Sequence, residues 1–282
     1  MIPRSICIAA GFACGFLVSA GVGAQQTDPR DELLREDARL TVQRDTDTDF
    51  GMTPFADRAA WEAYAEKLRL RIKVACGLWP EPERTPLNAR VFDTIEHEDY
   101  SVSKVTFEAF PGFLVTGNLY TPKGDGLFPA VLCPHGHWEK GRLEDTERGS
   151  VPARGITFAR MGVVAFTVDM IGYNDSRQFS FAWGHRPGDV PANVRRAQEL
   201  WGIHPFALQL WSNVRGLDFL QSLPNVDPER LSCTGASGGG TQTFALAAID
   251  DLVDVAAPVN MISNTMQGGC QCENAQLIRI DA

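Results

Sequence analysis

The segment Cys233-Thr-Gly-Ala-Ser-Gly-Gly-Gly-Thr241 decides the fold of this 282-residue chain. It places Ser237 between Gly235 and Gly239, the G-x-S-x-G spacing of a sharp turn from a strand into a helix. A short apolar run precedes the segment and a helix-favouring run follows it. Glycines on both sides remove the Cβ clashes that so tight a turn would create. The pattern predicts Ser237 as an exposed nucleophile; the alternative is an ordinary turn rich in Gly and Ser.

Backbone N–H groups near Ser237 are candidates to stabilise an oxyanion. Gly238 follows the serine in the first turn of the expected helix, where N–H groups lack helical partners and the helix dipole is positive. A second donor is expected from the loop after another apolar strand, in Cys133-Pro-His-Gly-His-Trp138. We assign this donor to the backbone of Gly136 or His137 without choosing between them.

All five histidines precede Ser237. In hydrolases built on this turn, an acidic residue and then a histidine follow the nucleophile. Residues 238–282 leave room for one helix and one strand. The sequence therefore predicts a hydrolase fold that lacks its last strands, and a fragment of low activity. The alternative is that an upstream histidine serves as the base.

The first 24 residues resemble a secretory signal peptide. Arg4 provides the positive start, residues 6–18 the apolar run, and Val22-Gly23-Ala24 the small residues of a cleavage site. The apolar run is too short for a comfortable membrane span. We therefore expect export to the periplasm or the medium. Residues 25–55 are expected to form a polar leader and 56–282 a single domain, incomplete at its C-terminus.

The net charge limits the expected binding partners, and the number of cysteines limits the expected disulfides. The formal net charge of −9 argues against nucleic acid and anionic membranes as partners, because no basic stripe is available to neutralise phosphates. Removing the signal peptide would leave five cysteines, an odd number, so at least one is free or intermolecular. Cys133 and Cys233 lie in expected buried strands, where a thiol behaves as a small hydrophobic group.

Hydrophobic periodicity predicts an α/β architecture. Ala56–Cys76 has the pattern of a helix with one apolar face, and Gly77 ends it. Three consecutive strands, Arg90–Glu98, Ser103–Phe110 and Phe113–Thr121, indicate an antiparallel start. Strands and helices then alternate, which favours a mostly parallel sheet with helices on both faces. The expected later strands cover 129–133, 162–168, 231–234 and 253–259, and the helices cover 156–161, 204–223 and 241–249.

An irregular stretch, 169–202, follows one of the expected strands. Asp169 begins it, at a strand end of the kind that faces active sites in parallel sheets. Asp169 is either a substrate-binding residue or a residue that caps the loop. Three tryptophans, Trp138, Trp183 and Trp201, are candidates to stack on a sugar ring; the alternative is that they pack in the core or in loops.

A zinc site is the competing interpretation of two short motifs. His135-x-His137 and Cys270-x-Cys272 contain suitable ligands, but the two pairs would have to converge from a tight turn and a distant loop. The oxyanion loop explains the first pair without a metal. We therefore predict no metal and no cofactor, and we place Glu273 and Asn274 near the pocket rim.

Several segments together resemble the α/β-hydrolase superfamily, in its acetyl xylan esterase-like group. The resemblance covers roughly residues 55–278 and implies an α/β-hydrolase fold. It also implies a serine esterase that removes acetyl or similar small acyl groups from carbohydrate. The acid and histidine of that family match no residue here. The segments that carry the resemblance are 77–88, 110–122, 134–138, 235–243, 257–261 and 268–274.

Two other functions stay open. A serine peptidase of the prolyl-oligopeptidase kind shares the turn at Ser237, although no propeller-like domain precedes it in this sequence. A non-catalytic binding protein with a degenerate hydrolase fold would account for the missing histidine. The expected partner in the preferred function is a small-molecule or carbohydrate ester.

The signal-peptide assignment predicts that the exported protein begins at Gln25. N-terminal sequencing of the protein recovered from the periplasm or medium of an expressing bacterium tests this. Recovery of a chain that retains Met1 would contradict it.

Overall fold

The computed structural model describes residues 54–178 and 205–260, with isolated positions between 191 and 200. No helix in this described part is long and apolar enough to cross a membrane. Several predictions concern residues outside it: the signal peptide, the leader up to residue 53, Trp183, Trp201, Cys270, Cys272, Glu273 and Asn274.

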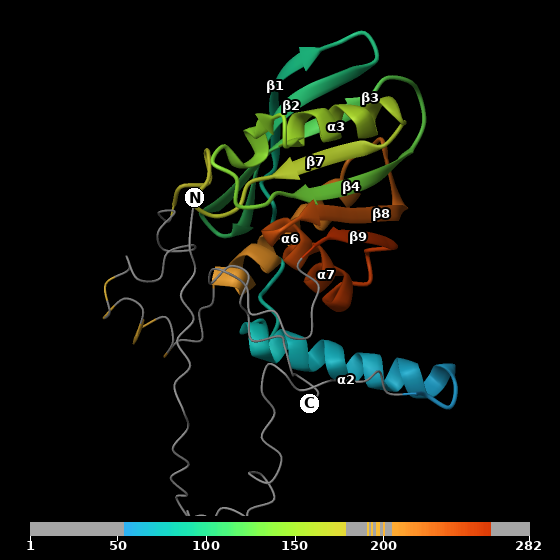
Figure 1. The fold of residues 1–282 in the computed structure, drawn as a ribbon, viewed down its shortest axis with the longest axis vertical. Helices are drawn as coiled ribbons and strands as arrows, with labels where there is room; N and C mark the ends of the chain where they lie inside the picture. Colours follow the sequence, from blue (N-terminus) through green and yellow to red (C-terminus); the bar gives the residue numbers. More distant parts are fainter. Residues whose placement is uncertain are drawn as a thin grey trace, which may run out of the picture. The chain divides into compact units, whose positions relative to one another are not determined.

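A seven-stranded mixed sheet organises the described residues (Figure 1). Its strand order is β1-β2-β3-β7-β4-β8-β9. The first three strands are β1 (Arg90–Glu96), β2 (Tyr100–Phe110) and β3 (Phe113–Pro122). They pair antiparallel, and β3 also pairs antiparallel with β7. The antiparallel start is confirmed, including the turn between β2 and β3, where Gly112 has a φ of 75°.

The other four strands run parallel to one another: β7 (Val164–Val168), β4 (Phe128–Pro134), β8 (Val226–Ala236) and β9 (Val255–Val259). Strands β4 and β7 are nearly continuous apolar runs because both faces of the sheet are covered there. Successive residues alternate between the faces, so Leu132 packs in one hydrophobic cluster while Val131 and Cys133 pack in the other. The predicted parallel half of the sheet is confirmed.

Helices cover both faces, as predicted. α3 (Val151–Arg160) packs on one face, where Ala159 meets Tyr120 and Ala165 in a cluster. Its N-terminus is capped by Ser150, whose hydroxyl accepts a hydrogen bond from the Ala153 N–H at 3.0 Å. α6 (Pro205–Gln221) and α7 (Gly238–Ile249) lie on the opposite face (Figure 1).

Helix α6 is more buried than an amphipathic helix with a single apolar face would be. In the structure most of the helix is buried, including Gln209, Asn213 and Arg215, each exposed by less than 5%. The helix lies between the sheet and the segment after α2: a Cβ atom on Gly216 would lie 3.2 Å from Leu132, and Arg215 donates to the Thr85 carbonyl. Packing on both sides therefore buries polar positions that periodicity assigns to solvent.

Other differences concern element boundaries. Helix α7 begins at Gly238, not at Thr241, although glycine is a poor helix former. β8 begins at Val226, because its first residues pair with β4. A short 3-10 helix at Gly141–Leu143 and a small hairpin of β5 (Asp145–Thr146) and β6 (Gly149–Ser150) were not predicted. The starts of α7 and β8, the 3-10 helix and the β5–β6 hairpin depend on tertiary contacts, since no local sequence pattern indicates them.

Helix α2 (Arg58–Cys76) ends at Gly77, which adopts the left-handed conformation expected of a C-terminal cap. The segment that follows is held by ion pairs. Lys73 lies 2.8 Å from Glu81, and Arg84 lies 2.5 Å from Asp218 on α6. The Lys73 hydrogen bond lowers the pKa of Glu81. This explains why charged residues recur in the segment 77–88.

The contact between α3 and the sheet yields a stability prediction. A Cβ atom on Gly155 would lie 2.6 Å from two atoms of the buried Tyr120 ring. We expect Gly155→Ala to lower the free energy of unfolding by about 1 kcal/mol or more, because overpacking outweighs the gain in helix propensity. Gly149→Ala is the matched control, since a Cβ there meets nothing within 4 Å. Denaturant melts in which both variants match wild type would contradict this packing.

Candidate active site

Ser237 lies where β8 ends and α7 begins, as the sequence predicted. Its backbone has φ 57° and ψ −123°, a combination that residues with a Cβ rarely adopt. Two backbone hydrogen bonds hold it: its N–H donates to the Val259 carbonyl and its carbonyl accepts from Thr241, both at 3.0 Å. The Ser237 side chain makes no capping hydrogen bond to the helix. The serine is thus held in a conformation that costs about 1–3 kcal/mol.

The glycines around Ser237 are required by a close approach between two strands. A Cβ atom on Gly235 would lie 2.5 Å from the Pro134 carbonyl oxygen, and one on Gly239 would overlap the same oxygen. Side chains at these positions would push the serine turn away from the end of β4. The G-x-S-x-G spacing therefore reflects contact with the neighbouring strand as well as the tight turn itself.

The loop after β4 lies directly against Ser237. A Cβ atom on Gly136 would lie 2.9 Å from the Ala236 carbonyl oxygen and 3.1 Å from the Ser237 Cβ. On the other side of the serine, the His137 ring is close to Gly238: its Nδ1 would lie 3.0 Å from a Cβ there. The structure brings together the four residues that the sequence selected: Ser237, Gly238, Gly136 and His137.

His135 determines how this loop is oriented. Its ring is fully buried, and the Met170 N–H donates to its Nε2 at 3.1 Å. Nε2 is therefore an acceptor, so the proton of the neutral ring is on Nδ1 and donates to the Gly136 carbonyl at 2.7 Å. The same carbonyl accepts from the Trp138 N–H at 2.9 Å. Because a trans peptide is planar, the His137 N–H points away from the His135 ring.

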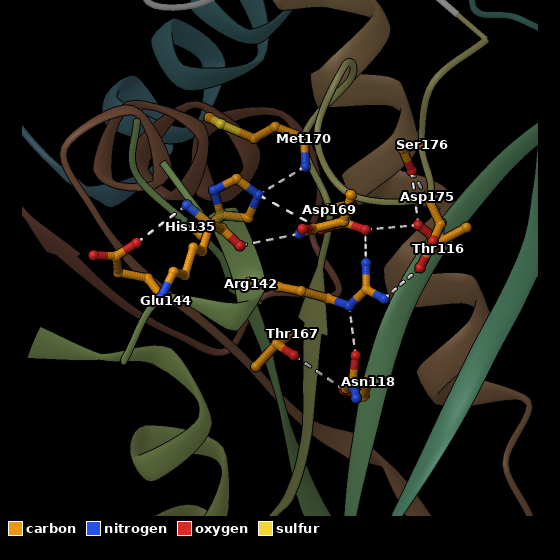
Figure 2. Close-up of polar contacts among 12 residues, drawn as sticks. Thr116, Asn118, His135, Arg142, Glu144, Thr167, Asp169, Met170, Asp175 and Ser176 are labelled. Carbon is orange, nitrogen blue, oxygen red and sulfur yellow. Dashed lines mark hydrogen bonds and ion pairs between the residues drawn. The ribbon is translucent and has the colours of Figure 1, made fainter. Parts of the chain in front are cut away.

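Asp169 lies behind His135 at the carboxyl end of β7, and its side chain is completely buried (Figure 2). One carboxylate oxygen accepts from Thr116 Oγ1 at 2.7 Å and forms an ion pair with Arg142; the other accepts from Asn174 Nδ2 at 2.7 Å. The second oxygen is also 3.9 Å from His135 Nε2. The carboxylate ties together three segments of the chain, and contact between Asp169 and substrate stays a prediction.

Arg142 is a residue of this network that sequence reasoning missed. Its guanidinium reaches Asn118 Oδ1 on β3 at 2.5 Å and Asp175 at 2.7 Å, besides Asp169 (Figure 2). It is 5% exposed, which is unusual for arginine unless it is paired. Nothing in its local sequence distinguishes it from the exposed charges nearby. Asp169 was selected only because it ends a strand.

Of the three tryptophans predicted to bind a sugar, only Trp138 lies among the described residues. Trp138 is half-buried, and its ring would lie 3.3 Å from a Cβ on Gly136. It therefore flanks the loop beside Ser237. Trp183 and Trp201 lie outside the described residues, so stacking on a sugar stays a prediction.

The cysteines near the site are not suited to act as nucleophiles. Cys133 and Cys233 are buried in β4 and β8, as predicted. Burial raises the pKa of Cys133 to about 11 and that of Cys233 to about 12, so both remain thiols at neutral pH. Among the described residues, no three side chains of His, Cys, Asp or Glu are grouped as metal ligands would be; the cysteine pair of the alternative zinc site lies outside them.

Comparison with models of protein families shows to which family the chain belongs. The sequence model of the acetyl xylan esterase family, AXE1, matches residues 86–265, which include both the loop after β4 and the Ser237 turn. The chain belongs to the acetyl xylan esterase family. The family and the α/β-hydrolase fold expected from the sequence are therefore confirmed.

Two proteins with related sequences share about a quarter of their residues with this chain over the aligned part. The chain is 26% identical over 168 residues to the acetyl esterase Axe7A of Xylanibacter ruminicola, covering 54% of this chain and 36% of that protein. It is 24% identical over 182 residues to the Bacillus subtilis protein YtaP, which is named only as a hydrolase, covering 62% of this chain and 57% of YtaP. The chain thus spans about half or less of the length of these relatives.

Solved structures agree on the fold. Methylesterase BT1017 is 28% identical, with a TM-score of 0.63, and the match covers 80% of this chain and 47% of the methylesterase. Acetyl xylan esterase 1 from Thermoanaerobacterium sp. JW/SL YS485 is 16% identical, with a TM-score of 0.50, covering 67% of this chain and 57% of that one. At this lower identity the second comparison supports the fold alone.

The backbone of Ser237 yields a second stability prediction. Ser237→Gly removes the Cβ that makes φ 57° unfavourable, which relieves more strain than glycine costs in unfolded-chain entropy. We expect Ser237→Gly to be about 1 kcal/mol more stable than Ser237→Ala, which keeps the Cβ. Denaturant unfolding of both variants measures the difference. Equal stabilities would show that the serine turn is not strained.

Proposed function

We propose that this chain carries the nucleophile and oxyanion hole of a serine esterase that removes acetyl groups from carbohydrate. The observation that carries the proposal is the placement of Ser237. It lies at a strained turn, its side chain does not cap the helix, and the loop 135–138 is packed against it. Membership of the acetyl xylan esterase family supports ester hydrolysis as the reaction class.

The proposed reaction proceeds by acyl transfer. Ser237 Oγ attacks the ester carbonyl carbon and gives up its proton to a base, forming a tetrahedral oxyanion. The oxyanion collapses, the bond to the alcohol oxygen breaks, and the protonated alcohol leaves an acetyl-serine. Water then attacks the acetyl-serine, which releases acetate and restores the serine.

We assign the two oxyanion donors to the N–H groups of Gly238 and His137. Gly238 is the first residue of α7, where the N–H has no acceptor within the helix and the dipole favours negative charge. Hydrogen bonds to the Gly136 carbonyl turn that oxygen towards His135, so the His137 N–H of the same peptide points the opposite way. This orientation favours His137 over Gly136, a choice that the sequence left open.

The base is not assigned to a described residue by its geometry. The acid and histidine that the family resemblance implies match no residue of this sequence. The His137 ring, which is half-buried beside Gly238, is the upstream alternative. The mechanism needs a base in either case. If the His137 ring is the base, this chain should hydrolyse esters at ordinary rates; if the base is absent from it, hydrolysis should be slow.

A second substrate class has support from one comparison. The solved structure that matches 80% of this chain at 28% identity is named a methylesterase. In a methyl ester of a sugar acid, the carbohydrate lies on the acyl side; in an acetylated sugar, it lies on the alcohol side. Acetyl ester hydrolysis remains the first choice because the family model and Axe7A both name it. Export also remains part of the proposal.

The catalytic prediction concerns Ser237→Ala. If the His137 ring serves as the base, we expect Ser237→Ala to lower kcat by about 10³-fold or more, because no other group can form the acyl intermediate. If this chain lacks its base, wild type is already slow and the further loss is small, because the members of such a catalytic group act as a unit. Acetate release from acetylated xylo-oligosaccharides and methanol release from methyl galacturonate measure the two substrate classes in parallel. Ser232→Ala is the matched control: it lies on the same strand, but its hydroxyl donates to the Ala130 carbonyl.

Each result has a distinct meaning. Hydrolysis at ordinary esterase rates that persists in Ser237→Ala would exclude the serine mechanism. Fast turnover of wild type that is lost in His137→Ala would identify the upstream base. Hydrolysis of a peptide substrate that depends on Ser237, without hydrolysis of esters, would favour the peptidase alternative. Binding of the carbohydrate ester without its hydrolysis would favour a binding protein.

A further inference from the structure

A small cavity lies beneath the proposed active site, between α6 and the carboxyl ends of β4 and β7. Pro134 closes it on the β4 side and Val168 on the β7 side, while Gln209 projects from α6. The remaining residues that line it are Asp169, Met170, Ile171, Ser212 and Asn213.

The side chain of Gln209 is the unusual feature of this cavity. The residue is 3% exposed, and neither Oε1 nor Nε2 has a hydrogen-bond partner among the described residues. A second amide adjoins it through Asn213, whose Nδ2 donates to Gln242 Oε1 at 2.9 Å. Gln242 is completely buried, and its Nε2 also lacks a partner in the described part of the chain.

Such a cluster is too costly to be left unsatisfied. Each buried polar atom without a partner shifts the folding equilibrium against the native state by roughly one to two powers of ten. Gln209 and Gln242 together contribute three such atoms. Native proteins satisfy buried amides of this kind with protein atoms or ordered water.

The hydrogen-bonding groups, charge and volume of the cavity limit which molecule can occupy it. Gln209 offers both a donor and an acceptor, so the occupant must accept and donate hydrogen bonds. The occupant must also be neutral, because the carboxylate of Asp169 is already compensated by Arg142. Asp169 Oδ1 accepts a hydrogen bond from Asn174, and a carboxylate oxygen can accept another. The small volume leaves room for a molecule of the size of water.

We propose that this cavity is a binding site for buried water, held by the amide of Gln209. The water lies behind Met170, which lines the cavity. Met170 also faces the active site: its N–H donates to His135, and its Cε would lie 3.0 Å from a Cβ on Gly238. The water therefore supports the residue that packs between the cavity and the serine turn.

A crystal structure of the full chain, at a resolution that shows ordered water elsewhere in the interior, tests the proposal directly. The expected result is a density peak of one water within hydrogen-bond distance of Gln209 Oε1 or Nε2. An empty cavity would overturn the proposal, as would a density that fits a larger molecule or a Gln209 amide bonded to protein atoms.

A stability measurement tests it independently. If the cavity holds water, Gln209→Leu removes the amide that anchors it, and the midpoint of thermal unfolding falls by about 2 °C or more. If the cavity is dry, the same change removes two unsatisfied atoms, and the midpoint rises. Ser212→Ala is the control: it lines the same cavity, but its hydroxyl already donates to the Leu208 carbonyl at 2.8 Å. A rise in the Gln209→Leu midpoint alone would overturn the proposal.

Discussion

The close contact between the serine turn and the end of β4 is the constraint on which the rest of the site depends. The Pro134 carbonyl oxygen occupies the space where side chains at 235 and 239 would lie. This contact sets the distance between two parallel strands at their carboxyl ends. It also places the loop after β4 beside Ser237, so the proposed nucleophile and the proposed second backbone donor come from segments about a hundred residues apart in sequence.

A buried polar network keeps that loop in place. His135 holds the Gly136 carbonyl on one side and the Met170 N–H on the other, and Asp169 lies behind it with Arg142. Buried ions carry a large desolvation penalty, so such a pair is weak evidence for stability. Its evident structural effect here is to join β3, β7 and the loop after β4. The orientation of one peptide plane beside Ser237 is thus determined by charges in the interior.

Helix α6 extends this polar interior beneath the site. Gln209, Asn213 and Arg215 occupy positions that a surface helix would expose, yet each is buried. Arg215 is paired with Asp218 at 2.5 Å, and Asn213 with Gln242. The amide of Gln209 differs because the described residues offer it no partner. The hydrophobic core of the family fold therefore has a polar layer directly under its reactive edge.

The sequence alone determined the order of strands and helices, the turn at Ser237 and the segment proposed to supply the second donor. Those features follow from local patterns: apolar periodicity, glycine spacing and turn residues. The orientation of the Gly136–His137 peptide, the hydrogen bonds of His135 and the involvement of Arg142 were decided only by the tertiary structure. Each depends on contacts between residues far apart in the chain. Local sequence cannot specify such contacts, because side-chain burial and hydrogen-bond partners arise only when the strands pack together.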